Sequence, residues 1–181
     1  LVISVHSIVS WDFAMSLISG WHSTLFAPYF VAGAIHSGLA MAFILLISLR
    51  RFLNLQNLIR TENLEMIAKT MLVTTAIMAY SYVIEPLMAW YGGDKFDIQY
   101  NYWEMTGGPA PAYWSLYLLN VLVPGLLVSK RLRRSVPYLF FVGILVNVGM
   151  YMERCMIVWA GLAHDYMPHN WSTYFPSDIV E

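Results

Sequence analysis

Residues 28–49 read PYFVAGAIHSGLAMAFILLISL, an apolar run with few polar side chains that is followed directly by Arg50 and Arg51. A helix of about 20 apolar residues crosses the ~30 Å hydrocarbon core of a bilayer, and this run is long enough to do so. Pro28 suits the first turn of such a helix, where its missing N–H costs no hydrogen bond. The run therefore predicts a membrane-spanning helix over residues 28–49.

Three further runs of spanning length follow along the chain: 66–91, 112–129 and 136–163. Lipid cannot satisfy backbone polar groups, so each run must be helical. Residues 1–27 contain one more helical stretch, expected to end at Gly20, which we interpret as the end of a further helix followed by a re-entrant or interfacial turn. We therefore predict an all-α polytopic transmembrane helix bundle, with residues 1–181 in a single membrane domain.

The composition argues against a soluble domain. Of the 181 residues, 59% are hydrophobic and 12% are charged, against averages of about 45–50% and about 25% in soluble proteins. The net charge of −1 and the lack of a basic stripe argue against a nucleic-acid partner. The single cysteine, Cys155, rules out an internal disulfide and an iron–sulfur cluster ligated by this chain alone. The lipid bilayer is the expected surrounding, and any metal redox centre belongs to a partner.

Basic residues predict the orientation of the helices. They gather in the connections between the first and second spans and between the third and fourth: Arg50, Arg51, Arg60, Lys130, Arg131, Arg133 and Arg134. The positive-inside rule places both connections in the cytoplasm. Residues 92–111 carry acidic side chains and are flanked by Trp and Tyr, which is typical of the outer membrane–water interface. Residues 1–27 and the tail 164–181 then lie on the same outer side.

Ionisable side chains at membrane depth are costly and are functional candidates by default. Glu153 and Arg154 lie near the expected bilayer midplane. Because adjacent residues on a helix point about 100° apart, each is expected to pair with a different helix. Glu85 precedes Pro86, which loosens the backbone beside an ionisable carboxyl. Two interpretations of Glu85, Glu153 and Arg154 stay open: a proton path, and a purely structural set of interhelical pairs.

Histidines inside and outside the spans have different expected roles. His36 is the only histidine within a spanning run; a membrane haem b held by two histidines needs one on each of two facing helices, so this chain is not expected to ligate haem by itself. We group His36 with the proton-path candidates. His164, Asp165 and His169 lack the spacing of a metal site, and we interpret them as docking residues for a peripheral subunit. No metal site is predicted.

Asp12 lies in SWDFA, residues 10–14, where apolar neighbours disfavour the charged carboxylate and favour a group that accepts a proton. His6 and His22 bracket it in the sequence. A histidine ring can donate a hydrogen bond to a quinone carbonyl or take a quinol proton near neutral pH. We predict Asp12, His6 and His22 as catalytic residues, and Asp12, His22 and Trp11 as quinol-binding residues. The alternative is a helix cap for Asp12 and interface histidines.

Five motifs together resemble the NrfD, or polysulfide-reductase, family of membrane subunits: VHSIVSWDFA at 5–14, GWHST at 20–24, PYFVAGAI at 28–35, GMYMER at 149–154 and HDYMP at 164–168. Within that family they are most similar to the quinol-oxidising ActC-type membrane subunit of alternative complex III. The resemblance covers essentially the whole chain. Because members of the family are longer, and this chain starts at Leu1, we expect a central fragment of a larger helix bundle.

The resemblance implies a multi-pass subunit of the bacterial inner membrane in a respiratory or photosynthetic electron-transfer complex. It implies binding and oxidation of quinol or menaquinol at the periplasmic side, with Asp12 facing a histidine of the missing helices. Electrons would pass to a docked iron–sulfur subunit and then to c-type haem subunits, and a second NrfD-like membrane subunit is a further expected partner. This chain is expected to ligate no haem or cluster and to act as an enzyme only within the complex.

Three other functions stay open. A quinone-reducing subunit of a polysulfide or molybdopterin oxidoreductase would keep the family and reverse the electron flow, and the identity of the partner separates the two directions. A transporter fragment would use its intramembrane Glu and Arg to line a substrate path and would bind its solute without redox partners. A structural anchor predicts that neutralising Asp12, Glu85 or Glu153 changes assembly alone. The sequence leaves open whether protons are translocated.

Overall fold

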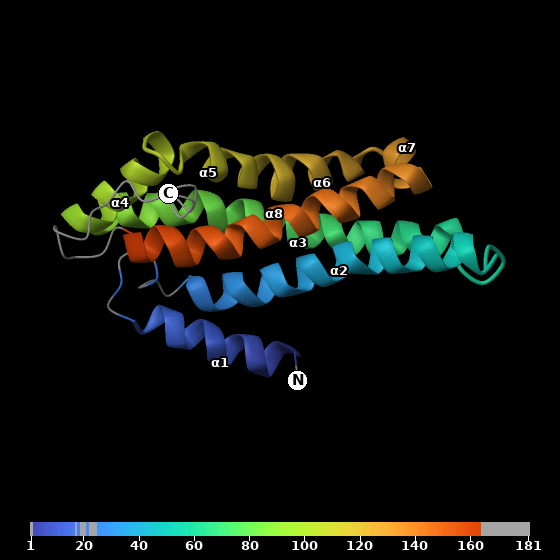
Figure 1. Ribbon diagram of the computed structural model, residues 1–181, viewed down its shortest axis with the longest axis horizontal. Coiled ribbons are helices and arrows are strands. Elements are labelled where there is room, and N and C mark those ends of the chain that lie inside the picture. The colour runs from blue at the N-terminus through green and yellow to red at the C-terminus, as the bar shows by residue number, and fades with distance from the viewer. Residues whose placement is uncertain (1, 17, 19–20, 22–24, 164–181) are drawn as a thin grey trace, which may run out of the picture.

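The computed structural model describes residues 2–16, 18, 21 and 25–163. All regular structure in this part of the chain is helical (Figure 1). In chain order the elements are α1 (Val2–Ala14), α2 (Phe26–Phe52), α3 (Thr61–Gly92), α4 (Lys95–Thr106), α5 (Ala110–Tyr117), η1 (Leu118–Leu122), α6 (Val123–Gly125), η2 (Leu126–Val128), α7 (Lys130–Arg133) and α8 (Val136–Ala163).

In the described part of the chain, four helical segments are long and apolar enough to cross a membrane: α2, α3, Ala110–Val128 and α8. The predicted class, an all-α polytopic transmembrane bundle, is confirmed. The helices expected over 28–49 and 66–91 are α2 and α3, which continue beyond the apolar runs at both ends. A helix keeps its hydrogen bonds in more polar flanking turns as well, so an apolar run marks the lipid-facing part of a helix and not its full length.

The second helix, α2, is central to the bundle. It packs against α1, α3 and α8, and Figure 1 shows it between α1 and the other spanning segments. Small residues bring α2 and α8 close together, since a Cβ atom on Gly143 would lie 2.8 Å from the carbonyl oxygen of Ala40. Close approach of this kind is what holds helices together in lipid, where there is little hydrophobic force between them.

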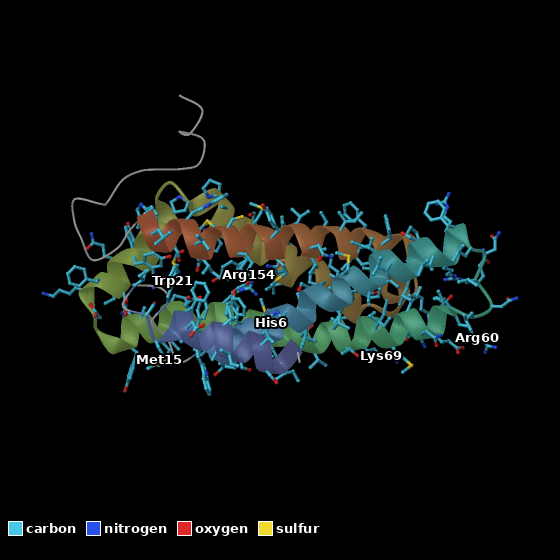
Figure 2. All side chains as sticks on the ribbon, turned by 60° about the horizontal axis from the view of Figure 1, so that its bottom comes forward. His6, Met15, Trp21, Arg60, Lys69 and Arg154 are labelled. Atoms are coloured by element: carbon cyan, nitrogen blue, oxygen red, sulfur yellow. The ribbon has the colours of Figure 1, made fainter. Side chains whose placement is uncertain are left out.

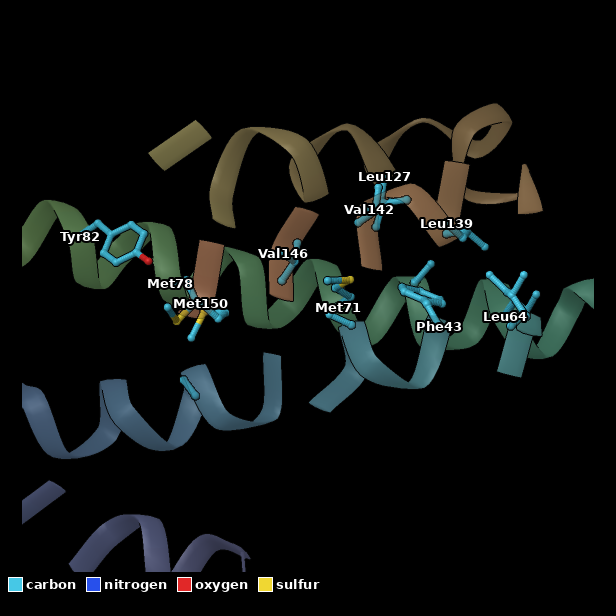
Figure 3. Packing of buried hydrophobic residues seen from close by; sticks show 14 of the residues in the cluster. Phe43, Leu64, Met71, Met78, Tyr82, Leu127, Leu139, Val142, Val146 and Met150 are labelled. Atoms are coloured by element: carbon cyan, nitrogen blue, oxygen red, sulfur yellow. The ribbon is translucent and has the colours of Figure 1, made fainter. Parts of the chain in front are cut away.

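A buried core runs along the interface of α2, α3 and α8 (Figure 3). Phe43, Met71, Met78 and Val146 have no exposed surface within it. Dispersion contacts are individually weak and collectively large, so a continuous and well-filled core can hold the bundle together. The same core forms an apolar layer between the two ends of the molecule.

The third spanning segment is irregular. Its turns change from α-helical in α5 to π-helical in η1 and to 3-10 in η2. Pro124 supplies the reason, because a proline lacks an N–H and its ring clashes with the carbonyl four residues earlier, here that of Asn120. The wider π turn accommodates this clash and directs the side chain of Asn120 into the bundle, where it is fully buried. Single π turns are frequent at functional sites.

The two ends of the bundle differ in chemistry. At the end formed by α7, Glu65 accepts an ion-paired hydrogen bond of 2.8 Å from Arg134 Nε, and Arg133 Nε lies 3.5 Å from the same carboxyl. At the end formed by α4, Gly93 ends α3 with a φ of 71°. Asp94 Oδ1 then caps α4 by accepting the Phe96 N–H at 2.9 Å. Figure 1 shows α4 and α7 at opposite ends.

The first helix, α1, ends at Ala14 and not at the expected Gly20. The chain leaves the helix in a tight turn, where the N–H of Ser16 donates to the carbonyl of Phe13 at 3.0 Å. Phe13 anchors this turn, since its ring centroid lies 4.8 Å from that of Trp21 and 6.2 Å from that of Phe30. Aromatic packing across the turn therefore replaces the last expected turns of the helix.

Candidate functional site

A cavity of about 50 Å³ lies near the α4 end of the bundle, among α2, α3, α4, α5 and α8. It has room for more than one water molecule. Its polar lining consists of glutamate and tyrosine side chains: Glu85, Glu104, Glu153, Tyr29, Tyr82, Tyr100, Tyr113 and Tyr117. Carboxyl and phenol groups can both accept and donate protons, so this lining can hold or pass a proton.

Glu153 lies at the deep end of the cavity and is 2% exposed. Tyr82 Oη donates a hydrogen bond to Glu153 Oε2. Asn120 Nδ2 donates to the same oxygen at 3.2 Å and to Tyr82 Oη at 2.9 Å. Three side chains from α3, η1 and α8 thus form one closed polar cluster. These neighbours replace the hydrogen bonds of water at Oε2, which lowers the cost of burying the carboxyl, while Oε1 has no hydrogen-bond partner among the described residues.

Neither of these partners, Tyr82 and Asn120, was among the site residues predicted from the sequence. The signals were present, because Asn120 is a polar residue four positions before Pro124, and Gly149 lies four positions before Glu153. A Cβ atom on Gly149 would overlap the amide oxygen of Asn120 and lie 2.8 Å from Leu119 Cβ. Glycine at this position lets η1 pack closely against α8.

Arg154 faces a different helix from Glu153, as predicted. Its guanidinium carbon lies 3.9 Å above the ring centroid of Phe30 in α2. A Cβ atom on Gly33 would lie 2.9 Å from Arg154 Nη2, so the absence of a side chain at Gly33 makes room for the cation. Arg154 Nη1 also lies 3.7 Å from Glu153 Oε1. The arginine therefore provides positive charge beside the buried carboxyl while its position is set by α2.

A proline in α3 explains how the tyrosines connect to this cluster. Pro86 has no N–H to offer to the carbonyl of Tyr82, four residues earlier. The Oη of Tyr117 in α5 donates to that carbonyl at 2.8 Å. Tyr113 Oη and Tyr117 Oη are also hydrogen-bonded, at 2.8 Å. The proline next to Glu85 thus leaves the carbonyl of Tyr82 free to accept a hydrogen bond from Tyr117. This bond and the one between Tyr117 and Tyr113 hold both phenol groups at the cavity.

Glu104 lies on α4, outside the spanning segments, and was not among the predicted site residues. Tyr100 Oη donates to Glu104 Oε1 at 2.9 Å. Burial raises the pKa of Glu104 from 4.5 to about 7, against the opposite effect of the hydrogen bond from Tyr100. Burial, reinforced by the charge of Glu104, raises the pKa of Tyr100 well above 10, so its phenol remains a donor. The carboxyl of Glu104 therefore changes charge near neutral pH.

Trp21 covers one side of the cavity. Its Nε1 donates to the carbonyl oxygen of Ile157 in α8 at 2.8 Å. A Cβ atom on Gly161 would lie 2.6 Å from that nitrogen, so glycine is needed for the indole to reach α8. Figure 2 shows Trp21 and Arg154 toward the same end of the bundle, away from Arg60. The turn after α1 is thereby attached to the spanning helix that carries Glu153.

Of the predicted quinol-site residues, His6, Trp11 and Asp12 do not line this cavity. Asp12 is exposed on α1, and the neighbouring Trp11 is 62% exposed. His6 is half-buried, with its ring centroid 6.2 Å from that of Phe30. Six residues separate His6 from Asp12, which places them about 9 Å apart along the axis and on different faces of the helix. His22 lies outside the described residues.

His36 is fully buried on α2 and is separate from the carboxyl cluster. Its Nδ1 lies 2.8 Å from Thr74 Oγ1, whose own proton goes to the carbonyl of Met71 at 2.9 Å. The histidine therefore donates from Nδ1 to the threonine. Along α3, buried Met78 lies between Thr74 and the glutamate-bound Tyr82. Among the described residues, no hydrogen bond joins His36 to Glu153 or Glu85.

The remaining predictions concern docking and metals. His164, Asp165 and His169, the predicted docking residues, lie outside the described residues. Within residues 2–16, 18, 21 and 25–163, no three His, Cys, Asp or Glu side chains gather as they would around a metal ion.

The sequence was compared with families and individual proteins of known function. Residues 1–164 match the family model described as "Polysulphide reductase, NrfD". No curated protein gives a significant match. The match covers most of the chain and agrees with the four helical segments, among the described residues, that are long and apolar enough to cross a membrane. This chain therefore belongs to the NrfD polysulphide reductase family, whose members are membrane subunits of quinone-interacting oxidoreductase complexes.

Proposed function

We propose that this chain is a quinol-oxidising membrane subunit of the alternative complex III type in a bacterial inner membrane, and that its carboxyl–tyrosine cavity carries protons. The observation that carries the proposal is the polar cavity itself, in a chain of a quinone-interacting family. Glu85, Glu104 and Glu153 line one water-sized space at the end of the bundle opposite the arginine-rich connections. The positive-inside rule makes that end periplasmic.

The quinol site belongs on the exposed side of α1 in this proposal. Trp11 and Ile8 are exposed there beside Asp12, and an apolar surface with one carboxylate suits a quinol ring and its isoprenoid tail. Oxidation of quinol releases two electrons and two protons. Asp12 accepts one proton and His6 or His22 takes the other, and the two electrons leave to a docked iron–sulfur subunit and then to c-type haem subunits. The tail with His164, Asp165 and His169 is the proposed docking segment.

The proton path starts at Glu85 and Glu104 and ends at Glu153 in this part of the chain. Phe13, next to Asp12, packs on Trp21 and Phe26, which both line the cavity. The quinol site and the cavity are thus separated by one aromatic layer. Arg154 Nη1 lies 3.7 Å from Glu153 Oε1 and so places a cation beside this end of the path. His36 is a further proton-path candidate on the other side of buried Met78, with no hydrogen bond to Glu153 among the described residues.

The test uses the assembled complex in vesicles, with electron transfer from a short-chain quinol to ferricyanide and proton release measured in the same sample. Asp12→Asn is expected to lose at least 90% of quinol turnover, because the isosteric amide cannot take the proton. Glu153→Gln is expected to keep most electron transfer and to release fewer protons per electron. Asp94→Asn is the control, since asparagine caps a helix as well as aspartate does.

Native gels of each variant complex establish equal assembly. Full turnover by assembled Asp12→Asn would overturn the quinol site, and unchanged proton release by Glu153→Gln would overturn the proton path. A complex that reduces quinone with electrons from a sulfur compound or a molybdopterin partner would reverse the proposed direction.

A further inference from the structure

A second and larger hollow lies at the opposite end of the bundle. This groove, of about 670 Å³, is formed between the last turns of α2 and the first turns of α8. Its walls are mostly apolar and include Ile47, Val136, Pro137 and Phe140. Arg50 and Arg51 form its rim. The volume is typical of a pocket for a small organic ligand.

The two rim arginines lack a counter-ion within the described chain. Arg50 Nη1 is buried and has no hydrogen-bond partner among the described residues. The ion pairs in the same part of the chain involve other cations at this end, with Arg133 and Arg134 on Glu65. A buried N–H group without an acceptor is costly. We therefore expect an anion to bind at the rim of the groove.

The position of the rim in the membrane indicates which kind of anion binds there. Arg50 and Arg51 directly follow the apolar run of α2, at the depth where a spanning helix meets lipid headgroups. Phe52, beside them, is 81% exposed and also lines the groove. Guanidinium groups bind phosphate through two parallel hydrogen bonds. Basic pockets between spanning helices on the cytoplasmic side are suited to acidic headgroups.

We propose that this groove binds one anionic phospholipid, with its phosphate on Arg50 and Arg51 and an acyl chain along Ile47 and Phe140. A free phosphate ion would use the arginines and leave the apolar wall exposed to water. An acyl chain covers that wall, and the headgroup supplies the missing acceptor for Arg50. One molecule thereby satisfies both the charge and the apolar surface of the groove.

The experiment measures lipid retained by the purified complex in a neutral detergent, by native mass spectrometry, after titration with phosphatidylglycerol or phosphatidylcholine. The intact complex is expected to retain phosphatidylglycerol at one site per copy of this chain, in preference to phosphatidylcholine. The double variant Arg50→Gln with Arg51→Gln is expected to bind it about 25-fold more weakly, about fivefold per arginine. Arg51→Gln alone, at an exposed residue, is expected to lose about fivefold.

The matched control is Arg60→Gln with Arg131→Gln, which removes the same charge at the same end from residues outside the groove. It is expected to bind phosphatidylglycerol as the unaltered complex does. Equal weakening by the control would overturn the proposal, as would equal retention of the two lipids. Displacement of the lipid by millimolar inorganic phosphate would also overturn it, since it would mark a site for a soluble anion. Phe140→Ala is expected to weaken lipid binding, and no effect of that change would contradict the acyl-chain contact.

Discussion

Glu153 has a buried carboxyl group whose Oε2 accepts hydrogen bonds from two elements and whose Oε1 lies near a cation. Tyr82 and Asn120 donate to one carboxyl oxygen, and Arg154 lies near the other. Removing both donors would leave Glu153 Oε2 unsatisfied, which costs more than the hydrogen bonds themselves contribute. The donors are therefore as necessary to the site as the carboxyl.

Glu104 is the residue from which a pH dependence can be predicted. Its pKa is 4.5 in an unfolded chain and about 7 in the folded one, so between these values the folded state binds more protons. Stability therefore falls as the pH rises from 4.5 to 7. We expect Glu104→Gln to remove this slope, on the order of 1 kcal/mol because the side chain keeps some solvent contact. Thermal unfolding of the complex at pH 5, 6, 7 and 8 measures it.

The same variant is expected to remove a step near pH 7 from the profile of proton release, if Glu104 belongs to the path as proposed. Glu62→Gln, which changes an exposed carboxyl on α3, is the control and should keep both pH profiles. An unaltered slope in Glu104→Gln would show that its carboxyl does not titrate in this range.

Among the helices, two prolines create the irregularities that build the site. Pro86 frees the carbonyl of Tyr82, which Tyr117 then uses, and Pro124 imposes the π turn that buries Asn120. Each proline removes a backbone hydrogen bond from its own helix, and in each case a side chain is thereby placed in the polar cluster. Regular helices at these positions would leave the cavity with fewer donors.

The contact between η1 and α8 is expected to depend on Gly149. Gly149→Ala would place a methyl group against the Asn120 amide and within 2.8 Å of Leu119 Cβ. Overpacking of this kind costs about 1–3 kcal/mol, so we expect a lower unfolding temperature and reduced proton release. Thermal unfolding and the vesicle assay together measure the effect.

Gly38→Ala is the matched control for this change, because it lies in α2 with nothing within 4 Å of the added Cβ atom. It should leave both measurements unchanged or raise the stability slightly, as alanine favours helix over glycine. Equal losses in the two variants would contradict the argument from packing.

The whole molecule is asymmetric along its axis. Carboxyl and tyrosine side chains gather at the α4 end, and arginines gather at the α7 end, where Glu65 is 8% exposed and holds Arg133 and Arg134. The apolar core with Met78 and Met150 separates the two. In Figure 3, Met78 and Met150 lie between Tyr82 and the other labelled core residues. A proton that enters at the α4 end therefore meets an apolar layer beyond Glu153.

Glu65 is expected to hold the α7 end together. Glu65→Gln leaves Arg133 and Arg134 without their carboxylate and separates α7 from α3. Because Arg134 is more than half exposed, we expect a lower unfolding temperature, with a smaller loss than for a fully buried pair. Thermal unfolding of the complex measures this loss of stability. Trypsin should also cleave faster after the basic residues in the range 130–134. Glu62→Gln, one turn earlier on α3, should change neither result.

The number of spans and their helical class follow from the sequence, because a bilayer requires long apolar helices. The expectation that Glu153 and Arg154 face different helices also held, since the pitch of a helix determines it. The partners of Glu153 did not follow. Tyr82 and Asn120 are far from it along the chain, and only packing across Gly149 and the π turn before Pro124 brings them together. The sequence by itself determines which segments form helices and which residues share a helix face. Contacts between distant segments depend on how the surfaces of the helices pack together.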